Sequence, residues 1–350
     1  MRLKKLMAAA MCIFLLAGAL CGCDKKIYIT TGLKADEIFK LSGEPCSLAE
    51  ILLVLMTEKS RYEEDLGVDI WSYNSADGDK NLEDEIKSKV KTQLAELKTI
   101  ELLADKEKIA LSDSDSEKLK SAAKEYYESL SEETIELLGV TEEDVLSLYT
   151  SFYKADKVYE KLTSDVNPEI SDEEARVIQV RYMLFPTCNI DESGQKIPLE
   201  EQDKLLVQQE AAEALKELDS GNDFSRVCAK YTGEAINAYI SRDNIQEAIE
   251  NVVFELESGQ ISPIIETSDG YYIFMCVSDY LESQTVDNKV KMQEEYKREA
   301  YSQVYKPFQA EQTFEFNNKV WDNIHLQDYI EVNTLSLYDV YNKWTAPTGE

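Results

Sequence analysis

Apolar residues recur at helical spacing through the first half of the chain. Ser47 stands before one such run and can cap the helix that the run predicts. Thr141 followed by Asp144 is a capping-box-like start of another helix. The longest apolar stripe consists of Leu82, Ile86, Val90, Leu94, Leu97 and Leu102. Because such a stripe must pack against other helices, residues 47–165 are predicted to form an all-helical lobe.

The period of the pattern changes at Arg176. The stretch "VIQVRYMLFPT" alternates and is rich in β-branched and aromatic residues, which predicts a strand with Val180, Tyr182 and Leu184 on one face. Two helices follow, then a weak strand at residues 238–241, a helix at about 246–254 and a final strand, "GYYIFMCVSD". This β-α-α-β-α-β order predicts a compact insert between helical segments. After Val286 the chain is predicted to be helical again to about residue 324.

The first residues have the pattern of a secretory signal. Arg2, Lys4 and Lys5 precede a mostly apolar run at residues 6–20, which is too short for a comfortable membrane-spanning helix. Leu20-Cys21-Gly22-Cys23 resembles a bacterial lipobox, which implies that Cys23 is acylated and becomes the new N-terminus. The protein is then expected to be extracytoplasmic and lipid-anchored to the cell membrane. The alternative is an uncleaved or ordinarily cleaved signal.

The charge of the chain limits its partners. The formal net charge is −31, with 68 acidic and 37 basic side chains. Such a surface repels nucleic acid, so no nucleic-acid partner is expected. The acidic surface suits cationic or unfolded clients, or it serves only to keep the protein soluble.

Cysteine and histidine usage limits the chemistry. Outside the signal and Cys23, the cysteines are Cys46, Cys188, Cys228 and Cys276. They are widely spaced without a CxxC pair, which indicates neither a zinc site nor a dense disulfide framework, and their pairing is left open. The only histidine, His325, follows an apolar helical pattern and is interpreted as structural. No metal ion and no cofactor are expected.

The spaced motifs of the insert resemble those of a known family. They are Gly221-Asn222-Asp223-Phe224, Phe254-Glu255-Leu256, Gly259-Gln260-Ile261-Ser262-Pro263 and Gly270-Tyr271. In this order and spacing they resemble the parvulin-type (PpiC-type) peptidyl-prolyl isomerase domain, over residues 176–281. The flanking helices resemble the split chaperone lobe of secreted foldases of the SurA and PrsA kind, into which a parvulin domain is inserted.

The resemblance implies a domain division and an α+β fold class. Residues 1–22 are the signal, 23–170 the N-terminal helical lobe, 171–283 the parvulin-like domain, and 284–350 the helix that returns to the lobe, with a tail. The apolar residues of the tail, Leu335, Leu337, Tyr338, Tyr341 and Trp344, are expected to pack on the lobe or to meet a partner, with core packing preferred.

The resemblance also implies site residues. Active parvulins place two histidines at the centre of the sheet, and the corresponding positions here hold Tyr182 and Tyr272, with Glu234 near the acidic or thiol position. The apolar cup for the proline ring is expected from Leu184, Tyr239, Ile245, Ile249 and Phe274. The paired tyrosines either keep a hydroxyl network or form a packed cross-strand pair.

The leading hypothesis is a membrane-anchored foldase that binds unfolded or proline-containing secreted polypeptides. In this reading, the helical lobe holds the client and the parvulin-like domain binds proline segments without the usual histidines. One alternative is an active peptidyl-prolyl isomerase with an altered centre, because prolyl isomerisation breaks no covalent bond. The other is a structural lipoprotein that reuses the fold. Enzymatic activity is left open.

Overall fold

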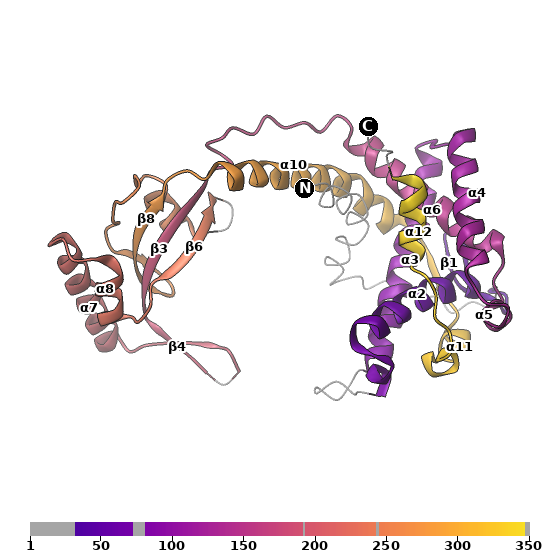
Figure 1. The fold of residues 1–350 in the computed structure, drawn as a ribbon, viewed down its shortest axis with the longest axis horizontal. Coiled ribbons are helices and arrows are strands. Elements are labelled where there is room, and N and C mark those ends of the chain that lie inside the picture. Colours follow the sequence, from indigo (N-terminus) through magenta and orange to yellow (C-terminus); the bar gives the residue numbers. More distant parts are fainter. Residues whose placement is uncertain (1–31, 73–80, 192, 243–244, 347–350) are drawn as a thin grey trace. The chain divides into compact units, whose positions relative to one another are not determined.

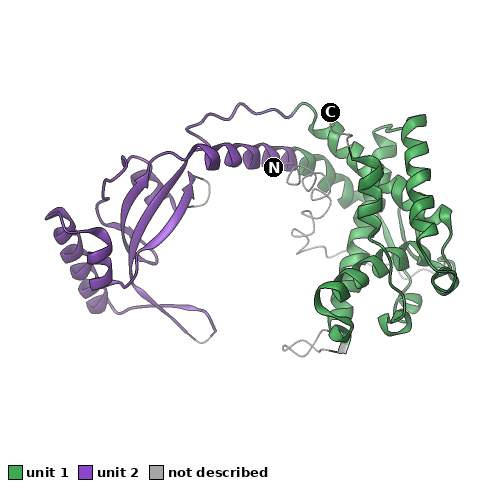
Figure 2. Ribbon diagram, in the orientation of Figure 1, with its two compact units in different colours: residues 1–165, 300–350 green, residues 166–299 purple. Residues whose placement is uncertain are grey.

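The computed structural model describes residues 32–72, 81–191, 193–242 and 245–346. The chain divides into two compact units, residues 1–165 with 300–350, and residues 166–299 (Figure 2). Figure 1 shows that the first unit combines the early and the late parts of the sequence, coloured indigo to magenta and yellow. The expected signal segment and the lipidation residue Cys23 lie outside the described residues.

Helices make up most of the first unit. They are α2 (Leu48–Leu66), η2 (Val68–Ser72), α3 (Leu82–Lys106), α4 (Asp113–Glu128), α5 (Glu132–Leu138), α6 (Glu142–Thr163), the last part of α10 (Glu282–Glu311), α11 (Asn318–Trp321), η4 (Leu326–Tyr329) and α12 (Leu337–Thr345). Capping residues determine where the predicted helices start. Ser47 and Glu50 form a capping box at α2, and Thr141 and Asp144 form another at α6, as the sequence predicted.

The first unit also contains a small sheet that the helical pattern did not reveal. Strands β1 (Glu37–Leu41), β2 (Glu44–Ser47) and β9 (Phe314–Phe316) form an antiparallel sheet in the order β2-β1-β9. Phe39 of β1 pairs with Phe316 of β9, so this sheet joins the two ends of the chain. The prediction of one continuous helical segment to about residue 324 is wrong at this point, because α10 (Glu282–Glu311) ends before β9.

The tail packs back on the helices of the first unit, as preferred from the sequence. Leu337 is fully buried, and the Tyr341 ring lies 5.6 Å from the Tyr149 ring between centroids. The Tyr149 hydroxyl donates to the Leu337 carbonyl over 3.0 Å. Leu335 differs from the rest because its side chain is 53% exposed. The tail is therefore part of the hydrophobic core rather than a free extension.

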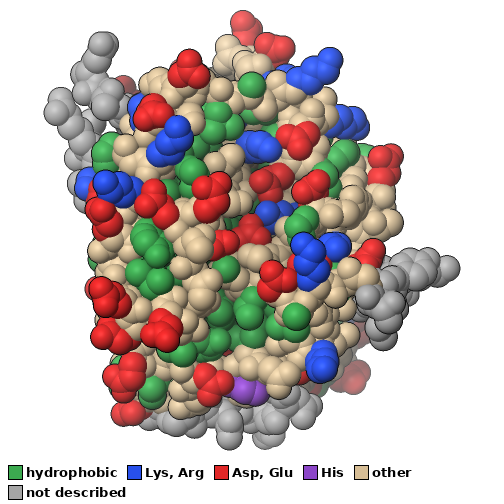
Figure 3. Space-filling model, turned by 90° about the vertical axis from the view of Figure 1, so that its right-hand side faces the viewer, with side chains coloured by type: hydrophobic (Ala, Val, Ile, Leu, Met, Phe, Trp, Pro, Cys, Tyr) green, Lys and Arg blue, Asp and Glu red, His purple; other side chains and the backbone are tan. Residues whose placement is uncertain are grey.

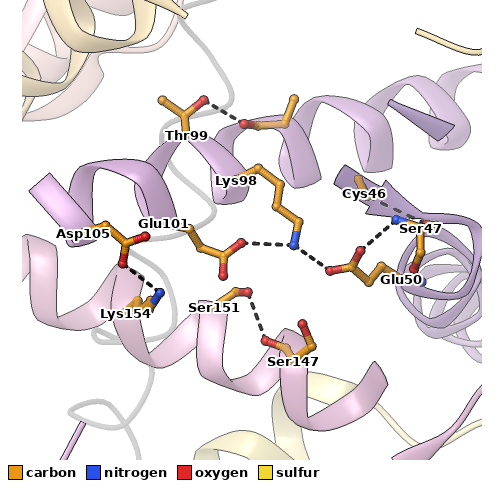
Figure 4. Close-up of polar contacts among 11 residues, drawn as sticks. Cys46, Ser47, Glu50, Lys98, Thr99, Glu101, Asp105, Ser147, Ser151 and Lys154 are labelled. Atoms are coloured by element: carbon orange, nitrogen blue, oxygen red, sulfur yellow. Dashed lines mark hydrogen bonds and ion pairs between the residues drawn. The ribbon is translucent and has the colours of Figure 1, made fainter. Parts of the chain in front are cut away.

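A buried ion triad ties α2 to α3 inside the first unit (Figure 4). Lys98 Nζ lies 2.7 Å from Glu50 Oε1 and 3.0 Å from Glu101 Oε2. Burial disfavours the charge on Lys98, but the two carboxylates outweigh burial and raise the pKa of the ammonium above its ordinary value. Burial also raises the pKa of the neighbouring Cys46 thiol, which therefore stays protonated. The triad therefore pairs the largely buried charges of Lys98 and Glu50.

The second unit is built on a four-stranded antiparallel sheet. Its elements are β3 (Val177–Pro186), β4 (Cys188–Ile190), β5 (Lys196–Pro198), α7 (Glu201–Asp219), α8 (Phe224–Tyr231), β6 (Ile236–Ser241), α9 (Glu247–Val253), β7 (Ile265–Thr267), β8 (Gly270–Ser278) and the first part of α10. The strand order is β6-β3-β8-β7, and β4 and β5 form a separate hairpin. The hairpin and β7 were not predicted.

The two faces of this sheet carry different apolar clusters. One face, with Met183, Phe185 and Ile273, packs against α7 through Ala214 and against α8 through Phe224. The other face forms what we call the cup cluster. Its buried members are Ile178, Val180, Ile240, Ile249, Val253, Phe254, Ile265 and Phe274. The predicted α+β fold class, helical terminal segments around an inserted mixed domain, is confirmed. Within the described ranges, the structure contains no helix that is long and apolar enough to cross a membrane.

Candidate functional site

Three aromatic rings meet on the cup face of the sheet. Tyr182 of β3 pairs directly with Phe274 of β8, and their ring centroids lie 5.2 Å apart. Tyr272 stands two residues before Phe274 on the same face, and its ring stacks on the Phe274 ring at 5.7 Å with an interplanar angle of 13°. The Tyr182 and Tyr272 centroids are also 5.7 Å apart. We call these three residues the aromatic trio.

Strand alternation explains why the trio forms. Tyr182, Tyr272 and Phe274 occupy alternate positions of two neighbouring strands, so all three side chains leave the sheet on one side. The register pairs Leu184 with Tyr272, and Ile265 of β7 pairs with Tyr272 from the other side. Phe274 is buried, whereas the two tyrosines are half-buried and can be reached by a ligand. The trio is therefore an accessible apolar surface on a rigid support.

Helix α9 and the segment before it pack against the cup cluster. Ile249 of α9 is buried in the cup cluster, and Ile245 packs against the same cluster. Tyr182 and Tyr272 also pack against it. The structure thus brings five of the residues expected at the site to the side of the sheet that holds Phe274, namely Tyr182, Leu184, Tyr272, Ile245 and Ile249.

Two arginines pack on the ring of Phe254, a buried member of the cup cluster. The guanidinium carbon of Arg242 lies 4.4 Å from the centre of the Phe254 ring, and that of Arg176 lies 5.2 Å from it. Both arginines pair with Glu173. Cation–π contacts of this kind stabilise a ring that is also packed in the cluster. Phe254 is therefore a fixed structural residue.

Tyr272 lies at a polar border of the aromatic trio. Lys196 Nζ of β5 lies 2.7 Å from Asp269 Oδ1, just before β8. Burial, followed by the charge of Asp269, raises the pKa of the Tyr272 hydroxyl above its ordinary value. The hydroxyl is therefore neutral near pH 7 and can donate a hydrogen bond but cannot act as a charged base. Among the described residues neither tyrosine hydroxyl of the trio forms a hydrogen bond.

A sequence-family comparison identifies this unit. The family model of the PPIC-type PPIase domain matches residues 191–278. The chain carries a parvulin-type domain. The match includes Tyr272 and Phe274 but begins after β3, so Tyr182 lies outside it. The resemblance that the spaced motifs suggested is confirmed for this domain.

Solved structures of foldases are similar to the chain at low identity. The chain is similar to PrsA of Bacillus cereus, with 18% identity, a TM-score of 0.36, and coverage of 78% of this chain and 97% of that one. It is similar to PrsA of Bacillus subtilis, with 18% identity, a TM-score of 0.23, and coverage of 77% and 96%. It is also similar to a SurA-like chaperone of Campylobacter jejuni, with 11% identity, a TM-score of 0.26, and coverage of 80% and 99%. No curated protein sequence matches the chain.

Two expected site residues lie away from the trio of the parvulin-type domain. Tyr239 pairs with Gln179, which lies on the face of the sheet opposite to that of Val180 and the cup cluster. The Tyr239 side chain is 62% exposed on that opposite face. Its assignment to the cup is wrong by one position, and its neighbours Ala238 and Ile240 take that place in the cup cluster. Glu234 is exposed in the connection between α8 and β6, two residues before Ile236.

The described cysteines and acidic residues form no metal centre. Cys46, Cys188, Cys228 and Cys276 are free thiols. In the part of the chain that the structure describes, no group of three or more histidine, cysteine, aspartate and glutamate residues is placed to hold a metal ion. His325 lies in the first unit with its side chain 58% exposed, so it takes no part in the parvulin-type domain. The candidate site is therefore the aromatic trio with the surrounding cup cluster.

Proposed function

We propose that the protein is an extracytoplasmic, lipid-anchored foldase that binds unfolded secreted polypeptides. In this proposal, the parvulin-type domain binds proline-containing segments on the aromatic trio, where tyrosines stand at the two positions that active relatives give to histidine. The observation that carries the proposal is the trio itself, three rings within 6 Å of one another on the sheet of the unit that contains the PPIC-type match.

The chemistry of the trio suits binding of a proline ring better than proton transfer. Rotation about an X–Pro bond breaks no covalent bond, and its barrier is the loss of amide resonance. A surface that receives the ring and part of the twisted amide supplies apolar contact without an acid or a base. The raised pKa of Tyr272 keeps its hydroxyl uncharged, which fits such a contact surface.

The surface of the first unit supports a role in holding clients. Leu66, Val68 and Leu137 are each more than half exposed, and they lie on a unit that is otherwise rich in acidic side chains. The face shown in Figure 3 carries separate green apolar areas among red carboxylates. Scattered apolar contacts with a hydrophilic surround favour weak, promiscuous binding of unfolded chains, and they do not favour one tight partner.

The first test measures binding and exchange of a short proline peptide by NMR with purified residues 24–350. We expect the peptide to bind and the Tyr182→Ala, Tyr272→Ala double variant to bind about thirtyfold more weakly, because each of the two rings supplies apolar and aromatic contact of about 1 kcal/mol. Tyr280→Ala is the matched control, since Tyr280 is 42% exposed in the same unit but lies outside the sheet.

The same spectra separate the two alternatives. Accelerated cis/trans exchange that disappears in Tyr182→Phe or Tyr272→Phe would replace the proposal with an isomerase whose centre uses the hydroxyls. Equal binding by the wild type and the double variant, with the domain still folded, would refute the assignment of the trio. Absence of binding to any unfolded polypeptide by the whole protein would favour a structural lipoprotein.

A further inference from the structure

Strand β6 is an edge of the sheet in the parvulin-type domain. The strand order is β6-β3-β8-β7, and within the described part of the chain β6 pairs with β3 alone (Figure 1). In an antiparallel pair every second residue directs its N–H and C=O groups away from the partner. The outer side of β6 therefore presents backbone donors and acceptors that no strand of the described structure satisfies.

The sequence of β6 lacks the features that normally protect an edge. It reads "INAYIS", six residues without a charged side chain and without proline. Natural edge strands are commonly kept short or are interrupted by charge or proline, because an open edge is a template for another chain. An uncharged six-residue edge without proline is therefore a site where a second strand can add.

The other described edges carry such protection. Strand β7, at the opposite edge of the same sheet, has three residues and includes Glu266. In the small sheet of the first unit, β2 contains Pro45 and β9 has only three residues. The hairpin strands β4 and β5 have three residues each. The contrast makes β6 a specific exception rather than a general property of the molecule.

The side chains of β6 are arranged to receive a partner on both faces. Tyr239 is 62% exposed and Ile236 is 47% exposed. On the cup face, Ala238 and Ile240 belong to or pack against the cup cluster, next to Val180 and Ile178 of β3. An added strand would thus continue the cup cluster on one face and meet the Tyr239 ring on the other.

We propose that β6 captures an extended, proline-free segment of an unfolded polypeptide by adding it to the sheet as a fifth strand. Only an extended chain offers N–H and C=O groups at the spacing that the open edge requires. A segment of six or seven residues spans about 20 Å and would match the length of β6. Apolar or β-branched residues at alternate positions would pair across from Ala238 and Ile240. The inference rests on the proposed function only for the source of the segment.

The proposal is tested with a heptapeptide of alternating valine and threonine, flanked by lysines and labelled with a fluorophore. We expect the peptide to bind the full chain and to slow amide hydrogen exchange at residues 236–241. An analogue that is N-methylated at every residue of the valine-threonine stretch has the same charge and side chains but cannot donate a backbone hydrogen bond to β6 from either of its edges. We expect the analogue to bind at least about tenfold more weakly, since it loses several backbone hydrogen bonds.

Matched variants place the peptide on β6. Tyr239→Lys puts a charge on the edge and is expected to weaken binding about fivefold or more, because an exposed aromatic cross-strand contact is removed. Leu206→Lys is the control, since Leu206 is 57% exposed on α7 of the same unit and gains the same charge. Equal binding of the peptide and its methylated analogue, or equal effects of the two variants, would overturn the proposal.

The same samples also test whether a second copy of the protein covers β6, and whether the trio takes part in binding the proline-free peptide. Slow exchange at residues 236–241 in the free protein, with a dimer in solution, would mean that a second copy covers the edge, and this also overturns the proposal. The Tyr182→Ala, Tyr272→Ala variant is expected to keep the proline-free peptide, because the trio is not part of the edge. If the protein fails to bind the proline peptide but still binds the proline-free peptide at β6, only the proposed function of the trio is refuted. The reverse result refutes only the proposed strand addition.

Discussion

Gly270 begins β8 in a conformation that excludes other residues. Its φ is +147°, and a Cβ atom would lie 2.1 Å from the Phe185 carbonyl oxygen. That oxygen belongs to the backbone of the paired strand β3, so it cannot move without breaking the register that aligns the aromatic trio. The Gly270-Tyr271 motif that helped to identify the domain therefore has a steric cause.

We predict that Gly270→Ala lowers the free energy of unfolding of the second unit by more than about 2 kcal/mol, because the clash is with rigid backbone. Gly259→Ala is the control, since Gly259 also has a positive φ, +90°, but open space around its Cα. Its cost is expected to be about 1 kcal/mol. Hydrogen-exchange protection of the β3 and β8 amides measures both changes, and equal effects would contradict the steric argument.

Single residues show how far the sequence could determine the site. Alternation along "VIQVRYMLFPT" predicts that Tyr182 and Leu184 share a face, whereas Tyr272 and Phe274 were expected at the site only from the family resemblance. The register of the structure pairs Tyr182 with Phe274 and Leu184 with Tyr272. Tyr239 was expected in the cup from the resemblance alone, and the structure places its neighbours Ala238 and Ile240 there instead. An error of one residue in the position along a strand moves a side chain to the opposite face of the sheet, so the face of Tyr239 is predicted correctly only if its exact position is known.

At the scale of elements, helices were predictable and short strands were not. Strand β9 has three residues, and it pairs with β1 from the other end of the sequence. Three residues show no period, and no local signal records a partner some 270 positions away. The available clue was that Phe314 and Phe316 stand two residues apart, as on one face of a strand, in a stretch that otherwise has a helical pattern.

The packing of α3 against the later part of α10 creates a pH-dependent contact. Burial, followed by the charge of Glu96 on α3, raises the pKa values of the Tyr301 and Tyr305 hydroxyls of α10. Burial also raises the pKa of the Glu96 carboxyl to about 7. The unfolded chain loses this proton near pH 4.5. Between about pH 4.5 and 7 the folded protein thus holds a proton that the unfolded chain has released, so stability falls as pH rises.

We predict that Glu96→Gln removes this decline and stabilises the first unit by about 2 kcal/mol at pH 8, with little change at pH 4. Urea unfolding followed by tryptophan fluorescence reports on this unit alone, because Trp71, Trp321 and Trp344 all lie in it. Glu136→Gln, at an exposed position of α5, controls for the loss of one negative charge. A decline of the same size in the Glu96→Gln variant would refute the assignment.

At the scale of the whole molecule, one unit is made from two distant segments. The contacts of β1 with β9, and of the tail with α4 and α6, join the start and the end of the described chain into one core. Periodicity alone predicted helices in both segments but not that they share a core; the resemblance to split-lobe foldases supplied that expectation. Long-range pairing depends on side-chain fit in three dimensions, which a one-dimensional pattern does not contain.

The proposed attachment of the molecule to a membrane rests on the lipobox-like sequence that ends at Cys23. In this proposal, acyl chains on Cys23 are the anchor. One acyl chain binds a membrane only marginally, whereas two or more give a firm anchor, because each buried methylene adds about 0.8 kcal/mol. The position of Cys23 after Leu20-Cys21-Gly22 makes it the expected acceptor, and Cys21 offers a neighbouring thiol for comparison.

We predict that Cys23→Ser moves the protein from the membrane fraction to the soluble extracytoplasmic fraction when it is expressed in a bacterium that processes lipoproteins. Cys21→Ser is the matched control and should stay with the membrane, because it changes a thiol two residues away without removing the acceptor. Mass spectrometry of the N-terminal peptide should find Cys23 as the first residue with its acyl chains attached. If Cys23→Ser stays in the membrane fraction, the apolar run at residues 6–20 is itself the anchor, and the signal is uncleaved.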